Sequence, residues 1–140
     1  MRPDCVFCKL VARQIPASVV YEDEETLAFM DLGQVNPGHV LVASKAHAEN
    51  VYGLSDAQAA AVFRAAARVA RAVRAAFEPP GLSIYQANGK PAGQTVFHFH
   101  LHVLPRHEGD GMQLVWPVNN PPRDQLEANA ERIRAALAGR

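Results

Sequence analysis

The chain has 140 residues, 49% of them hydrophobic and 20% charged, which is the composition of one globular domain with a core of its own. Its 14 basic and 14 acidic side chains give a formal net charge of zero at pH 7, so no strong electrostatic field draws it to polymeric nucleic acid. No apolar run approaches the roughly 20 residues of a membrane span and no signal-peptide core follows Met1, so we expect a cytoplasmic protein that binds neither nucleic acid polymers nor membranes.

Two cysteines near the N-terminus form the first motif along the chain. Cys5 and Cys8 are spaced C-x-x-C, which in a reducing compartment indicates metal binding or redox chemistry before a structural disulfide. No thioredoxin-like βαβ pattern surrounds them, so the redox interpretation is the weaker one. The pair offers two of the four ligands that a tetrahedral zinc site needs.

The N-terminal half is predicted to form one short helix and three strands. We expect a helix over residues 6–13, then strands over 19–21 and 27–30 that an acidic turn joins. The turn signal of residues 36–38 leads into a third strand over 39–43.

A long amphipathic helix is predicted in the middle of the chain. It begins at a capping box formed by Ser55 and Gln58, runs to about Phe77 and is ended by residues 79–81. Its expected core face carries Val62, Phe63, Ala66, Val69, Ala70 and Val73. Its other side is expected to be a solvated face with Arg64, Arg68, Arg71 and Arg74. A fourth strand over 82–86 and a loop over 88–93 follow.

Histidines alternate with apolar residues over residues 98–103. Successive side chains of a β-strand point to opposite faces, so one face of this strand is expected to carry His98, His100 and His102. The other face is expected to enter the core with Phe97, Phe99, Leu101 and Val103. Imidazole is the side chain best suited to attack, move protons or bind metal near neutral pH, so this strand is predicted to carry the chemistry.

The last expected element is a helix over about residues 121–138 that a proline pair opens. Together these elements predict an α+β fold, with about five antiparallel strands, one long helix packed across the sheet and a C-terminal helix. We expect a single domain over residues 1–140, with a core over about 4–110 and a C-terminal helical extension.

The residues by themselves define one chemistry and leave the metal ligands open. A neutral imidazole attacks a phosphorus centre and holds the phosphoryl group as a phosphoramidate, which splits one displacement into two. Backbone amides and polar side chains of residues 93–95 are suited to bind phosphate oxygens. For the metal, His47 and His98 complete a tetrahedral set with the cysteines, or the three histidines of the strand form the site while the cysteines are merely buried.

The histidine segment is similar to a known signature. His98-Phe99-His100-Leu101-His102-Val103-Leu104 resembles the H-φ-H-φ-H-φ-φ motif of the histidine triad (HIT) superfamily, and residues 36–42, 92–97 and 105–106 also look like that family. The resemblance implies that His100 attacks the α-phosphate of a nucleotide. It implies that His102 contacts the phosphate and helps to move protons around the leaving group.

The resemblance also implies which residues bind the nucleotide. They are Gln94 and Thr95 beside the α-phosphate, Asp31 at the ribose hydroxyls, and Phe29 and Leu32 at the base. Relatives place an amide side chain where this chain has Ala87, so Asn88 is the expected substitute. For His39, which matches a position near the site, we expect a supporting or packing role.

Relatives with an N-terminal C-x-x-C tend to carry a structural zinc. Their ligands match Cys5, Cys8, His47 and His98, so the resemblance implies Zn²⁺ as a structural cofactor. It leaves His100 and His102 for the chemistry.

The chain looks like zinc-containing bacterial-type members of the superfamily, closer to the Fhit-like than to the Hint-like branch because of residues 104–106. The implied activity is a nucleotidyl hydrolase or transferase that cleaves at the α-phosphate of a purine nucleotide conjugate through a covalent nucleotidyl-histidine. A dinucleoside polyphosphate and a nucleoside phosphoramidate are the expected substrates. The alternative is a zinc-stabilised nucleotide-binding or interaction module with little activity. Relatives are usually homodimers, for which residues 115–118 are interface or core candidates.

Overall fold

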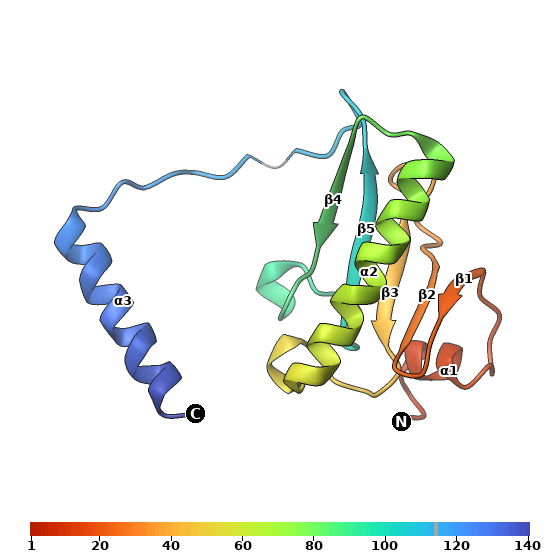
Figure 1. The fold of residues 1–140 in the computed structure, drawn as a ribbon, viewed down its shortest axis with the longest axis horizontal. Coiled ribbons are helices and arrows are strands. Elements are labelled where there is room, and N and C mark those ends of the chain that lie inside the picture. Colours follow the sequence, from red (N-terminus) through yellow and green to blue (C-terminus); the bar gives the residue numbers. More distant parts are fainter. Residues whose placement is uncertain (114) are drawn as a thin grey trace. The chain divides into compact units, whose positions relative to one another are not determined.

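The computed structural model describes residues 1–113 and 115–140, which form two compact units, Met1–Asp110 and Gly111–Arg140. The first unit contains a five-stranded antiparallel sheet in the order β1-β2-β3-β5-β4, with the helix α2 (Asp56–Phe77) lying across it (Figure 1). This confirms the predicted α+β fold. A single domain spanning the whole chain stays a prediction.

The strands are β1 (Val19–Glu22), β2 (Thr26–Met30), β3 (Val40–Ser44), β4 (Gly81–Tyr85) and β5 (His100–Arg106). The first three form a meander, and β5 pairs with β3 on one side and β4 on the other. Two short 3-10 helices, η1 (Val51–Gly53) and η2 (Lys90–Ala92), lie in the loops before α2 and before β5. Four of the strands lie within two residues of their predicted ranges, and β5 is the exception.

The turn between β1 and β2 is closed by Asp23. One carboxylate oxygen accepts hydrogen bonds from the backbone N–H groups of Glu25 and Thr26 and from the Thr26 hydroxyl, and the other accepts from the Tyr21 hydroxyl. Burial opposes ionisation of this group, but the hydrogen bonds outweigh it and lower the pKa of Asp23 to about 2. The ionised carboxylate therefore stabilises the folded state.

Replacing Asp23 with asparagine is expected to lower the free energy of unfolding at neutral pH by about 1 kcal/mol, because the partly exposed carboxylate is screened by solvent. The folded pKa lies below the ordinary value of 3.8, so this stabilisation is fully present above about pH 4 and is lost as the pH falls through about 2. Urea denaturation of both proteins at pH 5 and pH 3 tests this. A difference of equal size at the two pH values contradicts the role of the charge.

The two faces of the sheet are covered by different helices. The long helix α2 (Asp56–Phe77) packs on one face, where it buries Val62, Ala65, Ala66, Val69 and Val73 against side chains of β2, β3 and β5. The short helix α1 (Val6–Val11) packs on the other face, where Phe7 and Leu10 contact Phe29 and Leu41. The side chains that share this second face are the ones available for a site beside α1.

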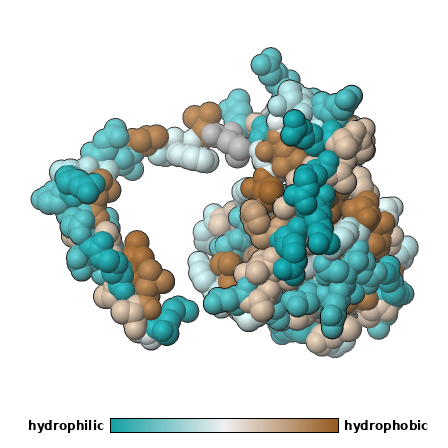
Figure 2. Space-filling view, viewed as in Figure 1, coloured by the Kyte–Doolittle hydropathy of each residue, from teal (hydrophilic) through white to brown (hydrophobic). Residues whose placement is uncertain are grey.

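The start of α2 is the predicted capping box. The Ser55 hydroxyl accepts from the Gln58 N–H, and the Gln58 side chain accepts from the Ser55 N–H. The four arginines are exposed as expected, and Figure 2 shows hydrophilic side chains along the outward face of this helix. The prediction that Phe63 is a core residue is wrong, since it is 57% exposed. It falls beyond the edge of the buried stripe, because each residue turns a helix by about 100°.

The predicted strand over 98–103 is wrong at its start, because β5 begins only at His100. His98 precedes the strand and is fully buried, whereas Phe97 is 44% exposed instead of in the core. β3 ends at Ser44, and just before His100 the N–H of Phe99 donates at 2.7 Å to the carbonyl of Ala48 in the loop after β3 instead of to a strand partner. Phe99, Leu101 and Val103 enter the core as predicted.

The second unit contains α3 (Arg123–Ala138), which confirms the predicted C-terminal helix. None of its residues is buried, and its exposed apolar side chains include Leu126, Ile133 and Leu137. Trp116 is 71% exposed, so it is not a core residue of this chain. Among the described residues no helix is both long and apolar enough to cross a bilayer.

Candidate functional site

A cavity of about 340 Å³ lies on the face of the sheet that carries α1. Most of its lining is apolar and comes from α1, residues 15–17, β2 and β3. Its polar side is formed by Asp31, Thr95, His100 and His102. The strand register explains this arrangement, because His102 pairs with Leu41 and His100 with Ala43, and paired residues project from the same face of a sheet.

His100 has a single orientation and a defined neutral tautomer. Its Nδ1 lies 2.7 Å from the carbonyl oxygen of His98, and a carbonyl only accepts, so Nδ1 carries the proton. Burial lowers the pKa of His100, so the ring is neutral at pH 7. Its Nε2 therefore holds a lone pair, and the ring of Phe7 packs against the imidazole at a centroid distance of 5.0 Å. A neutral, oriented imidazole of this kind is a nucleophile.

His102 lies beside His100 in a cluster of ionisable groups. Its Nδ1 is 2.9 Å from Nε2 of His39, and the Asp31 carboxylate lies 3.4 Å from His39 and 3.9 Å from His102. Burial lowers the pKa of His102 to about 4, and the neighbouring histidines add to this effect. His102 is therefore also neutral at pH 7.

The turn that carries Asp31 and His39 is held by Gln34, which sequence reasoning missed. Its side-chain oxygen accepts from the N–H groups of Gly38 and His39, and its nitrogen donates to the carbonyls of Asp31 and His39. No periodicity marks a glutamine in a turn as structural. The four hydrogen bonds hold Asp31 and His39 in place beside His102.

Four of the predicted nucleotide-binding residues line the cavity, namely Phe29, Asp31, Leu32 and Thr95. The ring of Phe29 is only 4% exposed and packs edge-on against Phe7 at a centroid distance of 5.2 Å. Leu32, by contrast, is fully exposed. The cavity thus combines an apolar wall, which suits an aromatic base, with a polar side at the histidines, which suits a phosphate.

Gln94 does not line this cavity, because its side chain is used inside the protein. It is 5% exposed, accepts from the N–H of Gly89 at 2.7 Å, and donates to the carbonyls of Glu49 and Val96. These bonds hold together the loop that leads to β5. Contact of the Gln94 side chain with a nucleotide stays a prediction.

Replacing Gln94 with alanine is expected to lower the free energy of unfolding by about 1–3 kcal/mol, because one N–H and two carbonyls lose their partner. Denaturation in urea measures the change, with the exposed Gln125→Ala variant as the control, for which we expect less than about 0.5 kcal/mol. Equal stability of the two variants contradicts this role.

Asn88 is likewise engaged within the loop. It exchanges two hydrogen bonds with the side chain of Gln86 and accepts from the N–H of Val51 at 2.8 Å. The amides on either side of Ala87 thus bind each other. A direct role for Asn88 at the substrate stays a prediction.

A second cluster lies next to the segment that precedes β5. It consists of Cys5, Cys8, His47 and His98. Nδ1 of His98 is 3.4 Å from Cys5 Sγ, 3.6 Å from Cys8 Sγ and 3.2 Å from Nδ1 of His47, which is in turn 3.4 Å from Cys8 Sγ. Zinc bonds of ordinary length give tetrahedral edges of about 3.3–3.8 Å. The four atoms therefore fit a zinc ion.

The tautomer of His98 also suits a metal. Nε2 of His98 donates to the carbonyl of Ser44 at 2.6 Å, so Nδ1 presents its lone pair to the sulfurs. Cys5 is the N-cap of α1 and Cys8 lies in its first turn, which brings both sulfurs to one end of the helix. When bound, zinc would link α1, the loop after β3 and the segment before β5.

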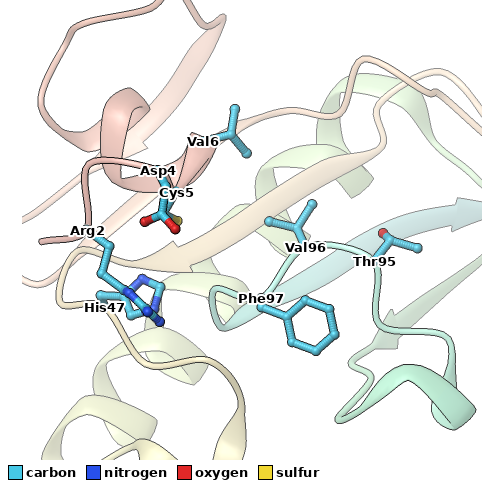
Figure 3. Close-up of a pocket in the computed structure, with 8 residues that line it drawn as sticks. All are labelled: Arg2, Asp4, Cys5, Val6, His47, Thr95, Val96 and Phe97. Atoms are coloured by element: carbon cyan, nitrogen blue, oxygen red, sulfur yellow. The ribbon is translucent and has the colours of Figure 1, made fainter.

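A smaller cavity of about 280 Å³ lies outside this cluster (Figure 3). Figure 3 shows Cys5 and His47 on one side and the segment Thr95–Phe97 on the other. Thr95 and Val96 also line the larger cavity, so this segment separates the two. Phe97 is exposed because it lies at this outer cavity.

A neutral, oriented histidine on a sheet that lines a largely apolar cavity, beside a Cys2His2 cluster whose spacing fits zinc, defines a class of protein with a histidine-centred site and a candidate metal site. The model of the family described as HIT domain matches residues 12–109, and the chain belongs to this family.

Relatives and solved structures agree with this assignment. Protein hit of Bacillus subtilis (strain 168) is 45% identical over 98% of this chain and 94% of its own length. Adenosine 5'-monophosphoramidase hnt1 of Schizosaccharomyces pombe is 32% identical over 95% of this chain and 98% of its own.

The fold is shared with crystal structures along nearly the whole chain. A HIT family protein from Bacillus anthracis superimposes with a TM-score of 0.92 at 41% identity, covering 97% of this chain and 99% of that one. A Zn-bound histidine triad family protein from Mycobacterium smegmatis gives 0.74 at 35% identity, covering 95% and 97%. The second structure shows that a relative holds zinc.

Proposed function

We propose that this protein is a nucleotide hydrolase that cleaves at the α-phosphate of a purine nucleotide conjugate. The observation that carries the proposal is His100, a neutral imidazole that lines the 340 Å³ cavity and whose Nδ1–H is bound to the His98 carbonyl, which leaves the lone pair on Nε2. The phosphoramidase name of the relative from Schizosaccharomyces pombe supports the same chemistry. The conjugate is a nucleoside phosphoramidate or a dinucleoside polyphosphate.

The reaction proceeds in two displacements at phosphorus. Nε2 of His100 forms a bond to the α-phosphorus, and the bond to the leaving group breaks with its electron pair. A phosphate departs as the anion, and an amine takes a proton from water. Water then attacks the phosphorus, loses a proton to solvent, and the P–Nε2 bond returns its electrons to His100, which releases a nucleoside monophosphate. His102 contacts the phosphate, Asp31 binds the ribose, and the apolar wall with Phe29 receives the base.

Zinc is proposed as a structural cofactor on Cys5, Cys8, His47 and His98. The distances among the four ligand atoms and the zinc-bound relative support it. Zinc supplies folding energy at this place and no step of the reaction. Because it needs both cysteines as thiolates, we place the protein in the reducing cytoplasm.

Trapping the covalent intermediate tests this function. The protein is mixed with each of three substrate classes (nucleoside phosphoramidates, dinucleoside polyphosphates and nucleotide sugars), quenched in alkali and analysed by mass spectrometry. We expect a nucleoside monophosphate adduct on the peptide that contains His100, formed from one of the first two classes. Nucleotide binding without any adduct or turnover would instead support the alternative, a zinc-stabilised nucleotide-binding or interaction module.

The leaving group is either a nucleotide, from a dinucleoside polyphosphate, or an amine, from a phosphoramidate. Leu104-Pro105-Arg106 favours the Fhit-like branch and hence a dinucleoside polyphosphate. The relative from Schizosaccharomyces pombe favours a phosphoramidate. Faster turnover of one class in the same screen decides between them.

We also propose that the protein is a homodimer, because the described part of the second unit exposes several large apolar side chains. They are Val115, Trp116, Val118, Leu126, Ile133 and Leu137. The last three lie on α3, where Figure 2 shows hydrophobic patches. Sedimentation velocity is expected to give a dimer for the wild type and a monomer for an Ile133→Glu, Leu137→Glu variant. A monomeric wild type contradicts the proposal.

A further inference from the structure

His39 lies directly against His102 and has no assigned part in the reaction. It precedes β3, is only 3% exposed, and its Nε2 forms a hydrogen bond of 2.9 Å with Nδ1 of His102. One of these two nitrogens donates the proton and the other accepts it. Which one donates determines what His102 presents to a ligand.

The backbone decides the direction of this hydrogen bond. The N–H of Val35 donates to Nδ1 of His39 at 3.3 Å, so Nδ1 holds a lone pair. A neutral imidazole carries one proton, which must then lie on Nε2 of His39. His39 therefore donates to Nδ1 of His102, and the proton of neutral His102 lies on its own Nε2.

The surroundings of the pair favour this neutral arrangement. Burial lowers the pKa of both His39 and His102. A second proton on Nδ1 of His102 would face the N–H of His39, whereas the nearby Asp31 carboxylate acts in the opposite sense and favours a positive charge. The ring of Tyr85 on β4 and the ring of His100 complete the groups around His102.

We propose that His39 is a positioning residue that holds His102 as its Nε2–H tautomer, so that His102 donates a hydrogen bond to a phosphate oxygen and does not give up a proton. The tautomer is independent of the proposed function, and only its effect on turnover rests on that function. Charge that develops on the phosphate oxygens is stabilised by such a fixed donor. His102 lines the cavity, and Nε2 is the nitrogen that its bond to His39 leaves for a ligand.

The same assignment argues against a second metal site. The ligand atoms of Asp31, His39 and His102 lie within 4.8 Å of one another, as those of the cysteine cluster do. In the cysteine cluster, however, His98 donates its proton to a carbonyl and offers a lone pair to the metal. His39 accepts a backbone N–H and keeps its proton toward His102, so it is a hydrogen-bond donor where a metal needs a lone pair.

The tautomer is measured directly by NMR. In the full-length zinc-loaded protein labelled with ¹⁵N, long-range ¹H–¹⁵N correlations distinguish protonated from unprotonated ring nitrogens, and a His102→Gln variant identifies the His102 signals. At pH 7 we expect a protonated Nε2 and an unprotonated Nδ1 on His102. A protonated Nδ1 on His102 in the wild type would overturn the inference, whatever the protein hydrolyses.

Two substitutions of His39 separate positioning from packing. His39→Leu fills the space but donates nothing, so we expect a mixture of His102 tautomers and a fall in kcat of about 10- to 100-fold with little change in KM. His39→Gln supplies an N–H at the place of Nε2 and is expected to keep the wild-type tautomer and kcat within about threefold. Equal losses in both variants overturn the inference.

These outcomes are distinguishable from failure of the proposed function. If the wild type turns over no nucleotide, the function fails while the spectra still decide the tautomer. If His39→Leu does not fold, as judged by its zinc content and circular dichroism, the spectra of the wild type and of His39→Gln decide it.

Discussion

Replacing His100 with asparagine is expected to lower kcat by at least about 10⁴-fold, because the proposed nucleophile is removed. Asparagine is the sharpest choice, since its amide N–H takes the place of Nδ1–H and donates to the His98 carbonyl. The loop before β5 therefore stays in place, and only the atom that attacks phosphorus is lost.

Two measurements check this result. Turnover of the preferred substrate class is expected to be lost, whereas calorimetry is expected to give a dissociation constant for nucleoside monophosphate within about threefold of that of the wild type. His107→Asn is the matched control, since His107 is exposed and is expected to leave both unchanged. Retention of a tenth or more of wild-type kcat by His100→Asn removes His100 from the mechanism.

The second large effect is expected at the metal cluster. Replacing Cys8 with serine is expected to abolish stoichiometric zinc and to lower the free energy of unfolding by at least about 3 kcal/mol, because the binding energy of a structural zinc is folding energy. Cys8 is almost completely buried, so water cannot take the place of its thiolate as a zinc ligand. The segment before His100 loses its anchor at the same time.

Non-additivity makes this test specific. Cys5→Ser is expected to have a similar effect, and the double variant is expected to be no less stable than either single one, since each removes the whole ion. His100→Asn is the control that keeps its zinc, because His100 does not belong to the cluster. A wild-type protein without zinc, or with a disulfide between the cysteines, contradicts the assignment.

Much of the site is visible in the local sequence. The C-x-x-C pair is close along the chain, so one turn of helix suffices to bring both sulfurs together. Likewise, alternation over residues 99–103 places His100 and His102 on one face and their apolar neighbours in the core. Patterns with a short period predict such arrangements because neighbours along the chain are also neighbours in space.

Other features follow from contacts between distant segments. His98 leaves the alternation because its ligand partners and the carbonyl of Ser44 lie 51 to 93 residues away. The side chain of Gln94 turns inward because Glu49, far from it in sequence, presents a carbonyl to it. Neither contact has a counterpart in the spacing of residues around position 94 or 98.

The sequence by itself determined the α+β class, the long capped helix, the C-x-x-C pair and the histidines that share a face, since each depends on a local period or a motif. The full set of four metal ligands was implied only by the resemblance to a known family. The tertiary structure decided where β5 begins, which polar side chains reach the cavity and which ring nitrogens carry protons. Those properties depend on single hydrogen bonds, both local ones such as that from Val35 to His39 and long-range ones such as that between His39 and His102. A hydrogen bond is determined by atomic positions that no residue pattern contains.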